Sequence, residues 1–301
     1  MERRKFIGRS AAASAALFTP VAGQHLREAS PQPESGKSET GAFKPKPTEG
    51  VINHSVCYWC YGSIPLDTFL GNIAELGIGA IDLVGPEEFP LLKKHGIHAS
   101  MCWGAGKGIV EGWNDPRLHD ELVADYNEKI PIIAEAGYTN LICFSGNRNG
   151  MNDLVGLQNC VEGLSKIMPT AEKYGVVLQM ELLNSKVDHK DYMCDNTLWG
   201  VELCRRLGTD HFKLLYDIYH MQIMEGDVIR NIREYHPYFG HYHTGGNPGR
   251  HEIDETQELY YPAIMRAIAA TGFTGHVAQE FIPSWEDKLA ALKQGIEICD
   301  I

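Results

Sequence analysis

Residues 173–182, KYGVVLQMEL, contain the pattern that decides the fold of this chain. The stretch closes an amphipathic helical segment at Gly175 and continues as a short apolar run that reaches a carboxylate at Glu181. A glycine after the last helical residue supplies the left-handed backbone conformation that ends a helix and turns the chain back. The segment therefore predicts a helix that is followed at once by a buried strand.

The same pattern recurs along the chain. Glycines close helical segments at positions 77, 96, 137, 175, 208 and 272, and apolar runs follow at 80–84, 98–103, 140–145, 176–182, 213–217 and 276–281. Further runs at 56–61 and 240–244 complete a set of eight. Eight strands that alternate with helices over roughly 250 residues predict an α/β protein, a single-domain (β/α)8 TIM barrel. A doubly wound open sheet is the alternative, but no Gly-x-Gly-x-x-Gly or Walker sequence follows any of the runs.

The N-terminal region predicts export. Arg3 and Arg4 precede an apolar run of small residues at 11–18, a pattern that resembles a twin-arginine signal. The alternative is an ordinary basic start before a surface helix. We expect a signal peptide over residues 1–23, a flexible linker over 24–50 that is rich in Ser, Pro, Lys and Gly, and a folded domain over 51–301. The expected location is periplasmic or otherwise extracytoplasmic.

Composition limits the partners. The chain is 44% hydrophobic with a formal net charge of −12, which argues against a nucleic-acid partner, because such binding depends on Lys and Arg. No apolar run downstream of the N-terminus has the roughly 18 residues of a membrane span. A small-molecule partner is expected, and a homo-oligomer is left open. Of the eight cysteines, Cys57 and Cys60 have a Cys-x-x-Cys spacing without a second pair, so we interpret the cysteines mainly as buried apolar residues.

Four polar residues stand at the ends of successive runs: Glu181, Asp217, His243 and Glu280. They are 36, 26 and 37 residues apart, which is about one βα unit each time. Active sites of barrels gather at the carboxyl ends of the strands, so these side chains are expected to converge. Any one of the carboxylates could instead make a salt bridge or cap the next helix.

Three carboxylates that converge in a partly dry pocket repel one another unless a cation neutralises them. Oxygen ligands with one imidazole and no thiolate suit a single divalent ion, Mn²⁺ or Mg²⁺, with Co²⁺ tolerated and structural zinc disfavoured. The sequence therefore predicts a metal site formed by these four residues.

Several segments carry a resemblance to a known family. They are MELLN at 180–184, YDIYHMQ at 216–222, GHYH at 240–243, NPGR at 247–250 and QE at 279–280. Over residues 51–301 the chain resembles the xylose isomerase-like barrel superfamily, and most of all its hydroxypyruvate isomerase group. The resemblance implies that Glu181, Asp217, His243 and Glu280 bind one divalent metal and that the two glutamates act as acid and base. It also implies an isomerase or epimerase that moves a proton through an enediolate, next to the carbonyl of a small sugar or hydroxy-keto acid.

Two departures from that group leave the substrate open. His243 stands where hydroxypyruvate isomerases usually have Gln, and a His there is more like the ketose 3-epimerases. The acidic residue that often follows the first glutamate by six positions falls here on Val187, with Asp188 and His189 displaced by one or two.

Five further residues are candidates for binding the substrate: His220, Arg250, His241, Trp59 and Trp103. Imidazoles can hydrogen-bond hydroxyl groups, the Arg250 guanidinium can grip a carboxylate with two bonds, and an indole can stack on a sugar face. The alternatives are a histidine at a helix start, a surface cation in a loop, and ordinary aromatic packing.

Two other functions use the same barrel. A lyase would use the metal site for β-elimination on 3-keto-glycosides, because removal of a proton beside a carbonyl is the first step of both reactions. A non-enzyme reading is an exported sugar-binding or scaffold protein, since a fold alone never implies a function. Cleavage of DNA at abasic sites, a third activity on this fold, is disfavoured by the charge of −12.

Overall fold

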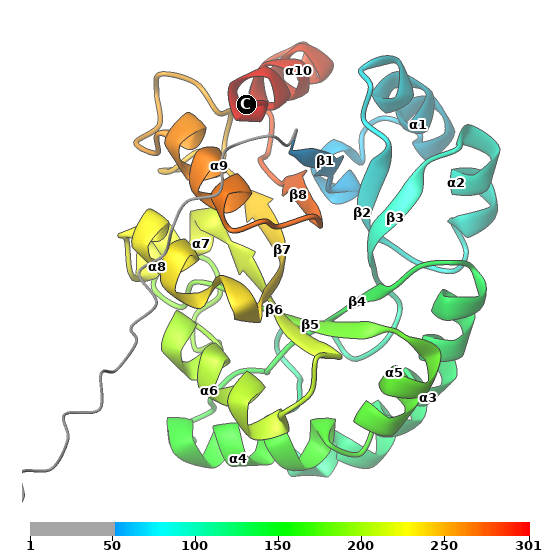
Figure 1. Ribbon diagram of the computed structural model, residues 1–301, viewed down its shortest axis with the longest axis vertical. Coiled ribbons are helices and arrows are strands. Elements are labelled where there is room, and N and C mark those ends of the chain that lie inside the picture. Colours follow the sequence, from blue (N-terminus) through cyan, green and yellow to red (C-terminus); the bar gives the residue numbers. More distant parts are fainter. Residues whose placement is uncertain (1–51) are drawn as a thin grey trace, which may run out of the picture. The chain divides into compact units, whose positions relative to one another are not determined.

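Short apolar segments, most of them directly after a helix-ending glycine, form the strands of the protein. The computed structural model describes residues 52–301, and eight parallel strands form an inner ring with helices around it (Figure 1). The strands are β1 (Asn53–Val56), β2 (Ala80–Val84), β3 (His98–Cys102), β4 (Asn140–Cys143), β5 (Val177–Glu181), β6 (Phe212–Asp217), β7 (Phe239–Thr244) and β8 (His276–Gln279). The predicted (β/α)8 barrel is confirmed.

From β2 to β8, each strand pairs in parallel with the next along the chain, and β1 pairs with β8. The ring closes between β1 and β2 through one parallel bridge, which joins Cys57 to Asp82. A parallel barrel of this kind places the carboxyl ends of all its strands at one face, where the site is expected.

Ten α-helices and three short 3-10 helices connect the strands in the described part of the chain. The α-helices are α1 (Leu66–Glu75), α2 (Phe89–His95), α3 (His119–Glu135), α4 (Asp153–Leu164), α5 (Met168–Tyr174), α6 (Thr197–Leu207), α7 (Ile218–Met224), α8 (Val228–Tyr235), α9 (Tyr261–Ala270) and α10 (Lys288–Cys299); the 3-10 helices are η1 (Tyr58–Tyr61), η2 (Pro116–Leu118) and η3 (His236–Tyr238). Gly96, Gly175 and Gly208 cap α2, α5 and α6 in the left-handed conformation, with φ of 68°, 70° and 64°. The predicted role of these glycines is therefore confirmed.

The first strand differs from its prediction. The run at 56–61 was expected to be a strand, but β1 covers Asn53–Val56 and residues 58–61 form η1. The ladder between β1 and β8 ends with Val56 opposite Gln279, and after it only Cys57 makes a further bridge, to Asp82 in β2, before η1 begins. As a consequence, Trp59 lies on η1 beyond the strand rather than at its end.

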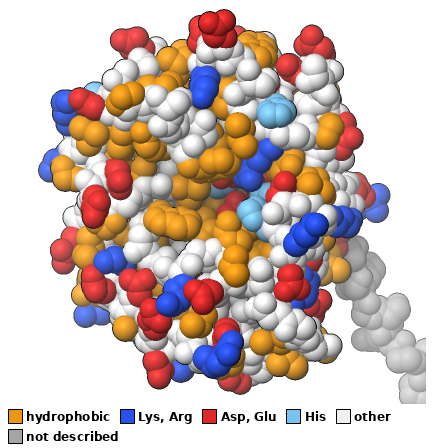
Figure 2. Space-filling view, turned by 180° about the vertical axis from the view of Figure 1, so that it is seen from behind, with side chains coloured by type: hydrophobic (Ala, Val, Ile, Leu, Met, Phe, Trp, Pro, Cys, Tyr) orange, Lys and Arg blue, Asp and Glu red, His pale blue; other side chains and the backbone are white. Residues whose placement is uncertain are grey.

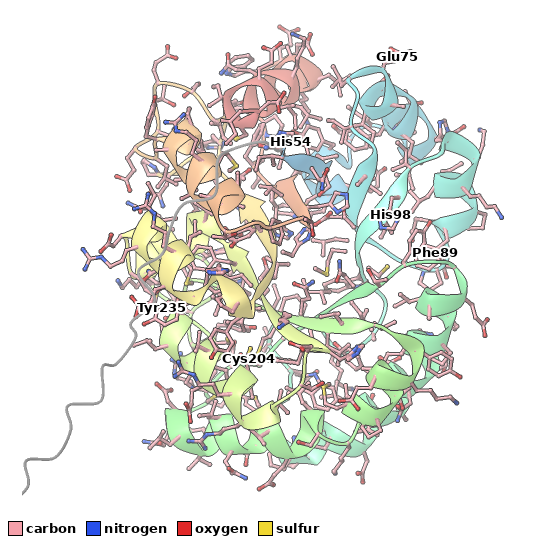
Figure 3. The ribbon with its side chains drawn as sticks, viewed as in Figure 1. His54, Glu75, Phe89, His98, Cys204 and Tyr235 are labelled. Atoms are coloured by element: carbon pink, nitrogen blue, oxygen red, sulfur yellow. The ribbon has the colours of Figure 1, made fainter. Side chains whose placement is uncertain are left out.

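The histidines of the barrel fall at opposite ends. His54 and His98 lie near the amino ends of β1 and β3, and His98 stacks on His276 at 5.8 Å between ring centroids (Figure 3). His243 lies toward the carboxyl end of β7.

All eight cysteines are buried and free, as expected for small apolar side chains in a core.

The predicted signal peptide (1–23) and linker (24–50) lie outside the described residues. Within residues 52–301, no helix combines the length and the apolar character that crossing a membrane requires.

Candidate metal centre

Four consecutive strands deliver the predicted ligands to one place. Glu181 is the last residue of β5, Asp217 is the last of β6, His243 lies one residue before the end of β7, and Glu280 directly follows β8. One atom from each of these side chains lies within 4.8 Å of the others, and all four residues are buried. The structure thus brings together the residues that the sequence singled out, and their role as metal ligands stays a prediction.

The imidazole of His243 lies at the centre of this cluster. Its Nδ1 is 2.6 Å from Glu280 Oε2 and 3.3 Å from Glu181 Oε1. Asp217 stands at the start of α7, where its Oδ1 accepts a hydrogen bond of 3.1 Å from the backbone N–H of His220. This cap fixes the carboxyl group of Asp217 and leaves its second oxygen directed at the cluster.

The electrostatics of the cluster call for a further positive charge. Burial raises the pKa of Asp217 to about 8, and the nearby Glu280 and Glu181 add to this effect against the opposing influence of Arg250. In the described residues, Glu181 Oε1 is buried without a hydrogen-bond partner. A divalent cation would supply both the missing charge and a partner for that oxygen, so the donor set of three carboxylates and one imidazole fits Mn²⁺ or Mg²⁺.

Arg250 partly supplies this charge. Its Nη2 lies 2.5 Å from Glu280 Oε2 and 3.2 Å from Asp217 Oδ2, and its Nε donates to the backbone carbonyl of Glu280 at 3.2 Å. The guanidinium also lies between the rings of Trp59 and Tyr219, 5.3 Å from each centroid. Burial tends to raise the pKa of Glu280, but Arg250 and then His243 outweigh it and hold that pKa well below its usual range. The alternative of a surface cation for Arg250 is therefore wrong.

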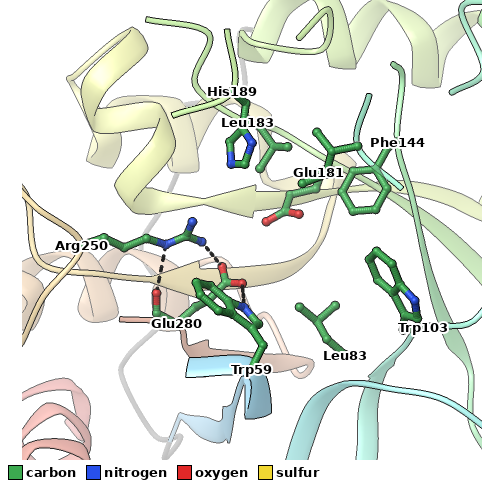
Figure 4. A pocket seen from close by; sticks show the side chains of 10 residues that line it. Trp59, Leu83, Trp103, Phe144, Glu181, Leu183, His189, Arg250 and Glu280 are labelled. Atoms are coloured by element: carbon green, nitrogen blue, oxygen red, sulfur yellow. Dashed lines mark hydrogen bonds and ion pairs between the residues drawn. The ribbon is translucent and has the colours of Figure 1, made fainter. Parts of the chain in front are cut away.

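A cavity of about 430 Å³ opens onto the cluster (Figure 4). Both predicted tryptophans line it, and Trp59 Nε1 also donates to Glu280 Oε1 at 2.7 Å. The lining residues are Trp59, Leu83, Trp103, Ile109, Phe144, Glu181, Leu183, His189, Arg250 and Glu280. In keeping with this lining, one face of the barrel has a hollow that is bordered mainly by hydrophobic side chains (Figure 2).

Two of the predicted substrate contacts lie outside this cavity. His241 is fully buried, and its Nε2 is 2.5 Å from Asp82 Oδ2, inside the barrel. His241 lies two residues closer to the amino end of β7 than His243, and its side chain does not line the cavity. This placement gives no support to a contact between His241 and the substrate. His220 is also fully buried, with Nδ1 2.6 Å from Asn184 Nδ2 and Nε2 3.5 Å from Asp217 Oδ2. It contacts the cluster but does not line the cavity among the described residues.

Sequence reasoning missed Asp82 and Asn184. Asp82 is fully buried in β2 and contacts both His241 and His243. An aspartate inside the apolar run at 80–84 was a usable signal, because a buried carboxylate has to be paired. Asn184 accepts from the backbone N–H groups of Val187 and Asp188 and shapes the loop after β5; it stands in the segment MELLN, which drew attention to its position but not to this role.

The sequence of the chain is similar to those of proteins named as isomerases. A zebrafish (Danio rerio) protein named putative hydroxypyruvate isomerase is 30% identical over 123 residues, which are 41% of this chain and 45% of that protein. The 2-oxo-tetronate isomerase of Haemophilus influenzae is 28% identical over 237 residues, 75% of this chain and 91% of that protein. The match thus spans less than half the length of the zebrafish protein and most of the length of the Haemophilus protein.

Solved structures support the fold. An AP endonuclease of family 2 from Brucella melitensis superposes with a TM-score of 0.73 at 21% identity, over 81% of this chain and 96% of that one. The 3-keto-D-glucoside 4-epimerase of E. coli gives a TM-score of 0.68 at 17% identity, over 82% and 98%. The sequence model of one family, described as a xylose isomerase-like TIM barrel, matches residues 87–300, which is more than half of the chain. The protein therefore belongs to the xylose isomerase-like TIM barrel family.

Proposed function

We propose that the protein is a metal-dependent isomerase or epimerase that moves a proton next to the carbonyl of a small sugar or hydroxy-keto acid. The observation that carries the proposal is the convergence of Glu181, Asp217, His243 and Glu280 in one buried cluster, of which the two glutamates line the cavity. Two glutamates beside a site for a divalent ion suit this chemistry, because one can remove the carbon-bound proton and the other, or the same one, can return it to the neighbouring carbon or to the opposite face.

Glu181, Asp217, His243 and Glu280 would hold the ion. A bound divalent cation would polarise the substrate carbonyl and stabilise the negative charge that develops on its oxygen. Glu181 is the better placed base, because its carboxylate lines the cavity and makes no side-chain hydrogen bond among the described residues, so one oxygen can bind the ion while the other accepts a proton. Glu280 instead accepts bonds from Trp59 and Arg250, which orient it at the opposite side of the cluster.

The relatives support proton transfer on a keto compound. The names of the zebrafish and Haemophilus proteins refer to hydroxypyruvate and to a 2-oxo-tetronate, both keto acids. Arg250 lies on the cavity wall and could pair with a substrate carboxylate. The neighbour from E. coli is named for a keto sugar, which carries no carboxylate. The proposed substrate class therefore includes both keto acids and keto sugars.

Solvent exchange tests the function directly. Purified protein with added Mn²⁺ is incubated in deuterated water with hydroxypyruvate, 2-oxo-tetronate, free ketoses and 3-keto-glucosides. We expect deuterium at the carbon next to the carbonyl of at least one compound, and none after chelation of the metal. Release of an aglycone would establish the lyase instead. A protein that binds metal and sugar without any exchange would be a sugar-binding protein and would refute the proposal.

We also propose export through the twin-arginine route, on the basis of Arg3, Arg4 and the apolar run at 11–18. Replacing both arginines with lysine keeps the charge but removes the pair that this route reads. We expect the variant precursor to stay in the cytoplasm, as measured by fractionation of cells that express the full chain. Unchanged export would point to the general secretory route.

A further inference from the structure

One wall of the cavity is apolar. In Figure 4, Glu280 and Arg250 lie on one side of the cavity with Trp59, and Glu181 lies across from them beside Phe144 and Leu183. Apart from these charged residues and His189, the side chains that line the cavity are hydrophobic. This apolar wall consists of Trp59, Leu83, Trp103, Ile109, Phe144 and Leu183. We propose that the wall is a subsite for an apolar group attached to the sugar, so that the substrate is a keto sugar with an aromatic or alkyl aglycone. The inference rests on the proposed function and names its substrate class.

Size and polarity support a substituted sugar. A cavity of about 430 Å³ is in the range of pockets that bury ligands of drug size, far more than a keto acid of three or four carbons fills. A free sugar also carries hydroxyl groups around its ring. Hydroxyls placed against Leu83, Ile109 and Phe144 would lose their hydrogen bonds to water without replacement. A sugar ring can place its C–H face on the indoles, but the aliphatic part of the wall favours an apolar group on the ligand.

The backbone at Leu83 is strained in a way that shapes this wall. Leu83 has φ of 61°, a conformation that L-residues other than Asn, Asp and Gly rarely adopt. The pairing of β2 with β3 shifts register between Asp82 and Val84, and Leu83 is the residue that bulges out. Bulges re-aim side chains next to active sites, and strain of this kind persists where function needs it. Here the bulge directs a leucine into the cavity while Asp82 still faces the barrel interior.

The tryptophans give the subsite an open aromatic surface. Trp59 and Trp103 remain 46% and 38% exposed although they are large and apolar. An aromatic group that enters the cavity would cover this surface, and burial of apolar area together with ring contacts would stabilise the complex.

A pair of matched substrates tests the subsite. Solvent-deuterium exchange is measured with the Mn²⁺-loaded full chain on methyl and phenyl 3-keto-β-D-glucopyranoside. We expect kcat/KM to be at least about 10-fold higher for the phenyl compound. Trp103→Ala should bring this ratio close to one. The control is Trp285→Ala, because Trp285 is 36% exposed but does not line the cavity, and this variant should keep the ratio.

Equal rates on both compounds, or a preference that survives Trp103→Ala and Phe144→Ala, would overturn the subsite. Absence of exchange with every substrate, simple ketoses included, would instead refute the proposed function. Binding of phenyl and methyl β-D-glucopyranoside, measured by calorimetry, needs no turnover and still tests the subsite in that case. Equal affinity for these two glucosides would overturn it.

A second inference concerns Asp82 and rests on separate contacts. Oδ2 of Asp82 lies 3.1 Å from His243 Nε2 and 2.5 Å from His241 Nε2. Oδ1 accepts hydrogen bonds from Ser55 Oγ, at 2.8 Å, and from Ser100 Oγ. The carboxylate is therefore held by side chains from the neighbouring strands β1 and β3 and faces β7 across the barrel interior.

We infer that Asp82 is a positioning residue for the metal centre. Its carboxylate is placed to accept the Nε2–H of His243, so that Nδ1, which lies 2.6 Å from Glu280 Oε2, would release its proton and present its lone pair to a bound ion. A histidine that binds a metal through one nitrogen is normally held by a hydrogen bond at the other, and the loss of that partner weakens metal binding. Asp82 would thus select both the tautomer and the ring orientation that the metal needs.

Metal affinity tests this role. Asp82→Asn keeps the size of the side chain but can present an N–H to Nε2, so we expect the Kd for Mn²⁺ to rise about 10- to 100-fold in a titration followed by electron paramagnetic resonance. The matched control is Ser100→Ala, which removes a bond to Oδ1 and leaves Oδ2 on His243. This variant should keep the wild-type Kd, even where the thermal midpoint of the metal-free protein falls.

An unchanged Kd in Asp82→Asn, or an equal loss of affinity in Ser100→Ala, would reduce Asp82 to a structural residue. If Asp82→Asn does not fold, the variant with both Ser55→Ala and Ser100→Ala decides. It removes both hydroxyl bonds that hold the carboxylate, so the orientation of Asp82 toward His243 would be lost and the Kd for Mn²⁺ should rise; an unchanged Kd in that variant would overturn the inference.

Discussion

Glu181→Gln is expected to lower the rate of carbon-bound proton exchange by roughly 10²-fold or more, while the protein keeps appreciable metal. Glutamine retains an oxygen ligand but lacks the basic carboxylate. The Glu181 carboxylate lines the cavity and makes no side-chain hydrogen bond in the described residues, so the oxygen that does not bind the ion is available to accept a proton. The exchange rate in deuterated water and the metal content of the same preparation together measure the effect.

Glu280→Gln should show a loss of similar size, because this side chain stands on the other side of the cluster. Two residues that act as one unit are not additive, so the double variant should be little worse than the poorer single variant. Exchange at the wild-type rate in either single variant would make that glutamate a ligand only. The base would then have to be sought among His220, Asp188 and His189, of which His189 lines the cavity.

The alternation of helices and strands could be predicted from the sequence because it depends on local chemistry. Glycine caps such as Gly175 and the apolar runs after them are readable one segment at a time. The exception is the first strand, whose extent depends on where β8 ends rather than on residues 56–61 themselves. The pairing of two strands that are far apart in the sequence cannot be predicted from either segment alone.

The site divides in the same way. Polar residues at strand ends, such as Asp217, could be found because a parallel barrel brings those ends together. His241 could not be separated from His243 by alternation, since residues two apart on a strand share a face and Asp82 on β2 contacts both imidazoles. Their distance from the carboxyl end of β7 decides which imidazole reaches the cluster. The bulge at Leu83 could not be predicted from the sequence either, because it arises from the pairing of β2 with β3.

Metal analysis of the wild-type protein is expected to find about one divalent ion per chain, and Asp217→Ala or His243→Ala should lower this occupancy strongly. Each substitution removes one of four ligands and leaves the remaining carboxylates without a shared cation. The wild-type protein should also gain thermal stability on addition of Mn²⁺, because a ligand that binds only the folded state stabilises it. Both variants should lose this gain, as measured by the thermal midpoint with and without Mn²⁺.

Asp195→Ala provides the control for general damage. Asp195 is also a buried carboxylate, but it pairs with Arg148 at 3.0 Å and does not belong to the cluster. Its loss should lower the thermal midpoint and leave the occupancy and the Mn²⁺-dependent gain in place. Full occupancy in both Asp217→Ala and His243→Ala would remove the proposed metal site, since the ion would then have to bind elsewhere. A loss of occupancy in Asp195→Ala of equal size would show that the metal reports on folding rather than on the four residues at the ends of β5 to β8.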